Sequence, residues 1–135
     1  MRNVSTLVIA SIALLLSLIV FLFAIPTQVT AQQPNVDCSK PMTAPEMRFC
    51  AAKSYQEADR KLNQAYKQVN SSLKGEERRL LTTAQQNWIR FRDNNCDFEV
   101  FQFRGASDSI LFRNECLERL TEQRTKDLRD YLNRR

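Results

Sequence analysis

Residues 81–96 read LTTAQQNWIRFRDNNC, and this stretch decides the fold class. Apolar side chains recur in it at intervals of three and four residues, the spacing that gives an α-helix one apolar face. Glu76 and Glu77 precede it, and acidic residues suit the positive end of a helix dipole. We therefore expect a long helix here, whose buried stripe consists of Leu81, Ala84, Trp88, Phe91, Asn95 and Phe98.

The stretch after this helix is ambiguous, because residues 98–103 alternate apolar and polar side chains. Such alternation is also typical of a β-strand. A lone strand would have no partner, so we interpret these residues as continued or frayed helix. Residues 105–107 then predict a turn at Gly105.

A second helix is expected upstream, beginning at a capping box. Thr43 can accept a hydrogen bond from the backbone of Glu46, whose carboxylate can return it, and Pro45 suits a first helical turn. Gly75 is expected to end this helix. Its predicted apolar face comprises Met47, Cys50, Ala51, Tyr55, Ala58, Leu62, Ala65, Val69 and Leu73.

A third helix is expected over residues 108–133. Short turns between long helices favour antiparallel neighbours, so the predicted fold is all-α, with three long antiparallel helices in one domain. The predicted inner face of the last helix comprises Ile110, Leu111, Leu117, Leu120, Arg124, Leu128, Tyr131 and Leu132.

The four cysteines predict two disulfides. Cys96 and Cys116 lie at equal distances in sequence from Ala106 in the predicted turn, which places them at the same height in a helical hairpin. Their pairing would leave Cys38 to join Cys50, and we favour this local arrangement. Because all the helical cysteines lie near one end of the bundle, Cys50–Cys96 with Cys38–Cys116 remains an alternative.

The N-terminal residues have the layout of a secretory signal peptide. Arg2 is followed by an apolar run over residues 7–25, and small residues at Val29 and Ala31 precede a predicted cleavage point. We expect a signal peptide over residues 1–31 and a helical domain over residues 32–135. The alternative is an uncleaved membrane anchor, because residues 7–25 approach the ~20 residues that span a bilayer. Both readings place the domain outside the cytosol, in the periplasm or the extracellular space.

The composition excludes several classes of function. The chain contains no histidine and only two glycines, so histidine-based catalysis, histidine-ligated metal sites and glycine-rich phosphate loops cannot be built from it. The formal net charge is +5, a mild excess that permits contact with anionic surfaces. We expect no cofactor, no metal ion and no nucleic-acid partner.

The order of the motifs resembles the LprI-like family, named for a lysozyme-inhibitor N-terminal domain. The shared pattern includes Leu-Asn-x-x-Tyr, Ala-Gln-x-x-Trp-x-x-x-Arg-Asp-x-x-Cys, and Thr-x-x-Arg-x-x-x-Leu after the last cysteine. It spans nearly all of the predicted domain. The matching positions are Cys38, Cys50, Tyr55, Asp59, Leu62, Asn63, Tyr66, Ala84, Gln85, Trp88, Arg92, Asp93, Cys96, Cys116, Thr121, Arg124 and Leu128.

The motif residues have simple structural interpretations. We expect Trp88 in the core and Arg124 paired with a carboxylate such as Asp93 or Asp59, because burying an unpaired charge is costly. Arg92 and Asp93 are adjacent on a helix and are expected to point apart. Two other motif residues, Asn63 and Gln85, could bond between helices. Tyr66 completes the motif set, whose members are expected to serve the fold or to bind a partner.

The resemblance implies a small, disulfide-bonded envelope protein that inhibits a lysozyme-like muramidase. Asp59 and Asp93 could be imagined as an acid–base pair for sugar cleavage, but nothing marks a cleft, so we expect no enzyme and no catalytic residue. A lipid anchor is not expected, because residues 35–37 are not a lipobox. The net positive charge disfavours animal-type lysozymes, which are strongly basic, unless a local acidic patch is present. The alternative function is a structural module that contacts the anionic membrane or wall.

Overall fold

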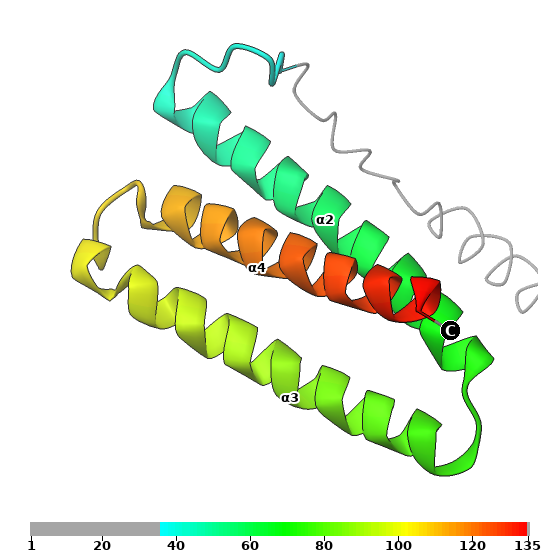
Figure 1. Ribbon diagram of the computed structural model, residues 1–135. Helices are drawn as coiled ribbons and strands as arrows, with labels where there is room; N and C mark the ends of the chain where they lie inside the picture. The colour runs from blue at the N-terminus through cyan, green and yellow to red at the C-terminus, as the bar shows by residue number, and fades with distance from the viewer. Residues whose placement is uncertain (1–35, 135) are drawn as a thin grey trace, which may run out of the picture. The chain divides into compact units, whose positions relative to one another are not determined.

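The structure is a computed structural model that describes residues 36–134. Three long helices form most of this part of the chain. They are α2 (Ala44–Ser72), α3 (Gly75–Glu99) and α4 (Ser109–Asn133), with a short 3₁₀ helix, η1 (Phe101–Phe103), after α3. Consecutive helices run antiparallel, so α2 and α4 point the same way (Figure 1). The predicted all-α architecture is confirmed.

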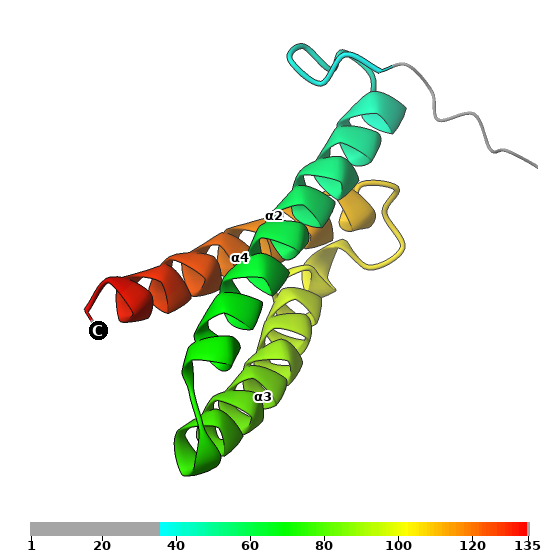
Figure 2. The ribbon, with the colours of Figure 1, turned by 90° about the vertical axis from the view of Figure 1, so that its right-hand side faces the viewer.

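Helix α4 occupies the central position of the bundle. It packs most extensively on α2 and less on α3, whereas α2 and α3 scarcely touch each other. Figure 2 shows α2 crossing α4, with the two helices separating toward the C-terminal end of α4. The close approach is possible because the buried face of α2 carries small residues at Ala51, Ala58 and Ala65.

Helix α2 follows the sequence prediction closely. The backbone amide of Thr43 donates to Glu46 at 3.0 Å, the amide of Glu46 donates to the Thr43 hydroxyl at 3.4 Å, and Pro45 lies in the first turn. The predicted face is buried or half-buried except for Met47, which is exposed at the edge of the bundle. The helix ends at Ser72, three residues before the predicted end at Gly75, and Gly75 instead begins α3 with a φ of +50°.

The core is built in two clusters. The larger cluster contains Leu62 and Val69 of α2, Leu73 at the C-cap of α2, and Leu128 of α4. Trp88 packs against this cluster. The smaller surrounds Cys96, Cys116 and Leu117. Trp88 is therefore a core contact, as predicted, although its side chain is only half-buried.

The predicted stripe of α3 is wrong at three of its six positions. Ala84, Phe91 and Phe98 are exposed, whereas the fully buried residues of α3 are Gln85, Arg92 and Cys96. The buried face of α3 is thus displaced by one position along the sequence from the predicted apolar face. This displacement occurs because Arg92 has polar partners on the other two helices and because Cys96 must face Cys116. The inner face of α4 is also corrected at one end, where Ile110 is exposed.

Both disulfides have the favoured local pairing. Cys38–Cys50 ties the segment before α2 to its second turn, and Cys96–Cys116 joins α3 to α4, with Cα–Cα distances of 5.5 and 5.6 Å. Gly105 lies between the bridged helices with a φ of +83°, which glycine adopts without steric cost. The predicted frayed helix over residues 98–103 corresponds to the end of α3 and η1.

The predicted signal peptide, its cleavage point and the start of the mature domain lie outside the described residues. Between residues 36 and 134, no helix has the length and apolar character needed to cross a membrane.

We predict unequal contributions from the two disulfides. The double variant Cys96→Ser/Cys116→Ser should lose about 3 kcal/mol of unfolding free energy, because the bridge closes a loop of 20 residues between two core helices. Cys38→Ser/Cys50→Ser should lose less, since Cys38 lies in an exposed segment. Denaturant unfolding of the oxidised proteins measures both losses. Equal losses would show that the segment before α2 is as firmly packed as the helices.

Candidate functional site

A buried arginine lies where the three helices meet. The side chain of Arg92 on α3 is only 8% exposed. Its Nε donates to Asp93 at 2.9 Å, its Nη1 donates to the Thr121 hydroxyl of α4 at 3.4 Å, and the same Nη1 lies 3.5 Å from the Asp59 carboxylate of α2. One guanidinium therefore contacts all three helices, and we call Arg92 with these three partners the arginine latch.

Two aromatic rings flank the latch. The guanidinium carbon lies 5.5 Å from the ring centre of Tyr55 on α2 and 5.3 Å from that of Trp88 on α3. A cation in this position is attracted to the electron-rich ring faces. The burial that surrounds Tyr55 also raises the pKa of its hydroxyl, although the charge of Arg92 opposes the rise.

The structure corrects the predicted role of Arg124. Arg124 is half-buried, and its Nε donates to the side-chain oxygen of Gln85 at 3.0 Å. The arginine that pairs with Asp59 and Asp93 is Arg92. The prediction that Arg92 and Asp93 point apart is also wrong, because the long arginine side chain bends back to its neighbour. Burial lowers the pKa of Arg124, although the charge of Asp127 opposes this effect.

The other motif residues make polar contacts around the latch. Gln85 bonds between helices, as predicted, by accepting from Arg124 of α4, whereas Asn63 donates to Asp59 within α2 at 2.8 Å. The hydroxyls of Tyr66 and Thr82 lie 3.3 Å apart and join α2 to α3. Most of the motif therefore holds the helices in register. Both carboxylates of the latch engage Arg92.

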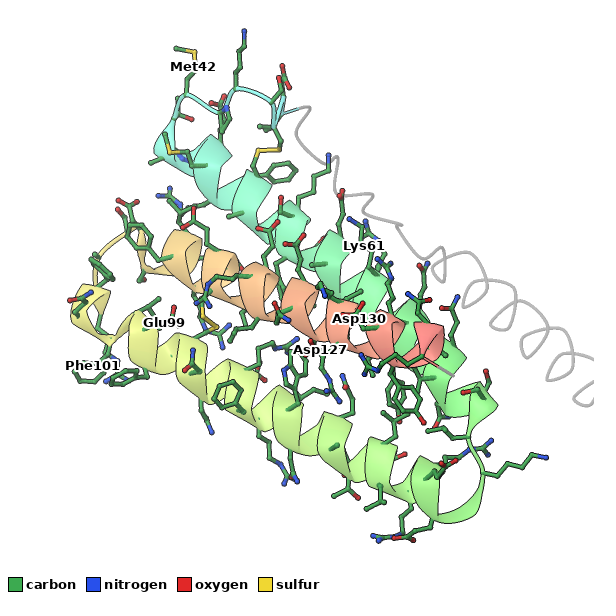
Figure 3. The ribbon with its side chains drawn as sticks, viewed as in Figure 1. Met42, Lys61, Glu99, Phe101, Asp127 and Asp130 are labelled. Atoms are coloured by element: carbon green, nitrogen blue, oxygen red, sulfur yellow. A yellow bond between two sulfur atoms is a disulfide. The ribbon has the colours of Figure 1, made fainter. Side chains whose placement is uncertain are left out.

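An acidic strip follows the face that α2 and α4 share. Glu115, Glu118 and Glu122 succeed one another along α4, and Glu57 on α2 lies close enough to interact with Glu118. Partial burial raises the pKa of Glu118, and the charges of Glu122, Glu115 and Glu57 raise it further. The cation that opposes this effect is Lys61 of α2, which Figure 3 labels. The protein is basic overall, so this strip is a local reversal of charge.

A shallow pocket extends the acidic strip toward the start of α2. It has a volume of about 350 Å³ and is lined by Pro41, Met47, Cys50, Ala51, Ser54, Leu111, Glu115 and Glu118. Carboxylates thus border an apolar floor. The only signal for this surface in the sequence is the spacing of residues 115, 118 and 122, which places them on one helix face.

A second pocket lies at the opposite end of the bundle. It has a volume of about 430 Å³ and is mainly apolar, with Leu80, Leu81 and Ala84 of α3 facing Leu128 and Tyr131 of α4. It forms where the last turns of α4 separate from α3. Among residues 36–134, no group of three or more acidic or cysteine side chains is placed to hold a metal ion.

Comparison with known proteins identifies relatives of this chain. The profile of the family described as "Lysozyme inhibitor LprI" matches residues 37–128. An uncharacterized protein of Rhizobium meliloti (strain 1021) is 31% identical over 115 residues, covering 76% of this chain and 83% of that protein. No solved structure matches the chain significantly. The family match runs from the segment before Cys38 to Leu128 and so contains both disulfides and the arginine latch.

The arginine latch predicts a large loss of stability on truncation. Arg92→Ala should lower the unfolding free energy by about 2–3 kcal/mol, because Asp59, Asp93 and Thr121 lose their contact with the guanidinium. The loss is smaller than for a fully buried ion pair, since solvent screens both carboxylates, whose side chains are 41% and 42% exposed. Arg90→Ala, an exposed substitution on the same helix, is the control and should change stability little. Equal losses in urea unfolding would contradict a central role for the latch.

The acidic strip predicts a pH-dependent gain from removing one charge. The pKa of Glu118 is higher in the folded protein than its ordinary value of 4.5, so the protonated side chain stabilises the fold at pH values below 4.5. This stabilisation is lost as the pH rises through the raised pKa. Glu118→Gln should therefore raise the melting temperature at pH 7, with the difference shrinking as the pH falls toward 4.5. Glu76→Gln should do the opposite, because Arg79 lowers the pKa of Glu76. Thermal unfolding between pH 3 and 7 tests both signs.

Proposed function

The chain belongs to the lysozyme inhibitor LprI family, and on that premise we propose that it is an exported cell-envelope protein that binds and inhibits a lysozyme-like muramidase. Family membership supports an inhibitor rather than an enzyme. The two disulfides support export, because such bonds persist in oxidising compartments. We further propose that residues 1–31 act as the signal peptide and that the working domain begins at Gln32, in the periplasm or extracellular space.

The observation that carries this proposal is the acidic strip on an otherwise basic protein. A uniformly basic surface would repel a basic muramidase, whereas the strip offers a complementary face for one. The charges of Glu57, Glu115 and Glu122 all act on Glu118 there, although Glu57 also pairs with Arg60 at 3.8 Å. Repulsion among them costs stability, and residues that cost stability are typical of functional surfaces.

The pocket beside the strip supplies the second element of a protein-binding surface. Interfaces combine an apolar centre with a polar rim that excludes water. Here the apolar floor is formed in part by Met47 and Leu111, and the rim by Glu115 and Glu118. The cystine at Cys50 fixes the floor, so the surface is formed before a partner arrives. Preformed surfaces avoid the entropic cost of ordering on binding.

The test is the lysis of bacterial cell walls by an animal-type lysozyme in the presence of excess purified protein. We expect inhibition that saturates with protein concentration. Glu118→Gln/Glu122→Gln should weaken it about tenfold, chiefly by slowing association, and added salt should reduce the difference between the two proteins.

The matched control is Glu76→Gln/Glu77→Gln, which makes the same change in net charge at the start of α3. It should inhibit like the unaltered protein. Equal weakening by both double variants would show that overall charge, not the strip, governs binding. Failure of the unaltered protein to inhibit any muramidase tested would refute the proposed function.

A further inference from the structure

Large apolar side chains are exposed together at the end of the bundle where α3 turns into α4. We call Phe98, Phe101, Phe103, Ile110 and Phe112 the aromatic end. Phe98 is 79% exposed, and Phe101 and Ile110 are each 61% exposed. Two of the rings, Phe103 and Phe112, pack against each other with their centres 4.8 Å apart, which fixes the turn. Figure 3 shows Phe101 projecting outward from this turn.

The aromatic end adjoins the start of α2. Arg48 in the first turns of α2 pairs with Asp108, the N-cap of α4, at 3.4 Å. Met42, which precedes α2, is also strongly exposed and projects away from the helices (Figure 3). This end of the molecule therefore presents apolar side chains from both the segment before α2 and the α3–α4 connection.

The carboxylates next to the aromatic end are paired with arginines. Asp97 lies 2.7 Å from Arg113, Glu99 lies 2.8 Å from Arg119, and Asp108 pairs with Arg48 as described. The bond from Arg119 lowers the pKa of Glu99, so this carboxylate stays ionised and paired. These three pairings reduce the negative charge beside the aromatic rings, where Glu115 also lines a pocket with Phe103 and Phe112.

One arginine at this end has the geometry of an interfacial side chain. The guanidinium carbon of Arg104 lies 4.8 Å from the ring centre of Phe101. Arginines with an apolar stem against hydrophobic surface can reach lipid phosphates while the neighbouring rings enter the membrane interface. Aromatic side chains are enriched at this depth of a bilayer.

We propose that the aromatic end inserts into the interfacial region of a lipid bilayer and docks the domain on the membrane. The occupant is the bilayer rather than a protein groove because Phe98, Phe101 and Ile110 project from a turn, and a deformable lipid surface accommodates such a shape. Burial of apolar rings drives the insertion, and three of the neighbouring carboxylates, at Asp97, Glu99 and Asp108, are paired with arginines. This inference does not depend on muramidase inhibition.

The experiment places a fluorescent reporter at the tip. In the exported protein, Phe101→Trp should shift its tryptophan emission to shorter wavelength when vesicles of phosphatidylcholine with phosphatidylglycerol are added, and brominated lipids should quench it. The signal of Trp88 in the unaltered protein is subtracted. Phe91→Trp is the matched control, because Phe91 is 55% exposed on α3 but lies away from this end, and its emission should not change.

A second measurement separates membrane insertion from other causes. Phe98→Ser/Phe101→Ser should reduce co-flotation with the same vesicles at least tenfold, whereas Phe91→Ser should not. Addition of 0.5 M salt should change the vesicle binding of the unaltered protein little. Both variants should still inhibit lysozyme if the proposed function holds. Unchanged Phe101→Trp emission with vesicles would overturn the inference. A concentration-dependent shift without vesicles would also overturn it and indicate self-association.

Discussion

One buried guanidinium sets the geometry on which the rest of the bundle depends. Helices α2 and α3 barely contact each other, so the hydrophobic core alone does not fix the rotation of α3. Arg92 does so, because its charge requires the carboxylates of Asp59 and Asp93 and the hydroxyl of Thr121 at once. Burying an unpaired charge is costly, and this cost excludes most other arrangements of the three helices.

The sequence predicted the fold more reliably than the packing of individual helices. Helix α2 was predicted well because its small and apolar residues recur without polar interruption, so the period alone identifies the buried face. Helix α3 was not, because its buried residues include Gln85 and Arg92, and a polar side chain is buried only when its partners come from elsewhere in the chain. Phe91 and Phe98 were assigned to the core because apolar character was the available criterion. Their exposure depends on tertiary contacts that a periodic pattern does not contain.

The same limitation explains which functional residues were found. The family motif directed attention to Asp59, Trp88, Arg92 and Asp93, and the structure shows that they hold the helices together. The candidate binding surfaces lie outside that set, in the acidic strip and the aromatic end. Glu115, Glu118 and Glu122 had a signal in their helical spacing, but acidic residues on a helix face are most often simply solvated. Only the proximity of Glu57 on α2 distinguishes this face from an ordinary one.

The two proposed surfaces adjoin at Glu115, which lines a pocket with Phe103 and Phe112. From there the acidic strip runs along α4 to Glu122, whereas the aromatic end surrounds the α3–α4 connection. A domain docked through Phe98 and Phe101 would therefore keep the part of the strip at Glu118 and Glu122 open to a partner. Muramidases act on the wall polymer outside the membrane, so an inhibitor held at the membrane would meet an enzyme that has already passed through the wall. Cys96–Cys116 joins α3 to α4 between these surfaces, and it therefore fixes the position of one relative to the other.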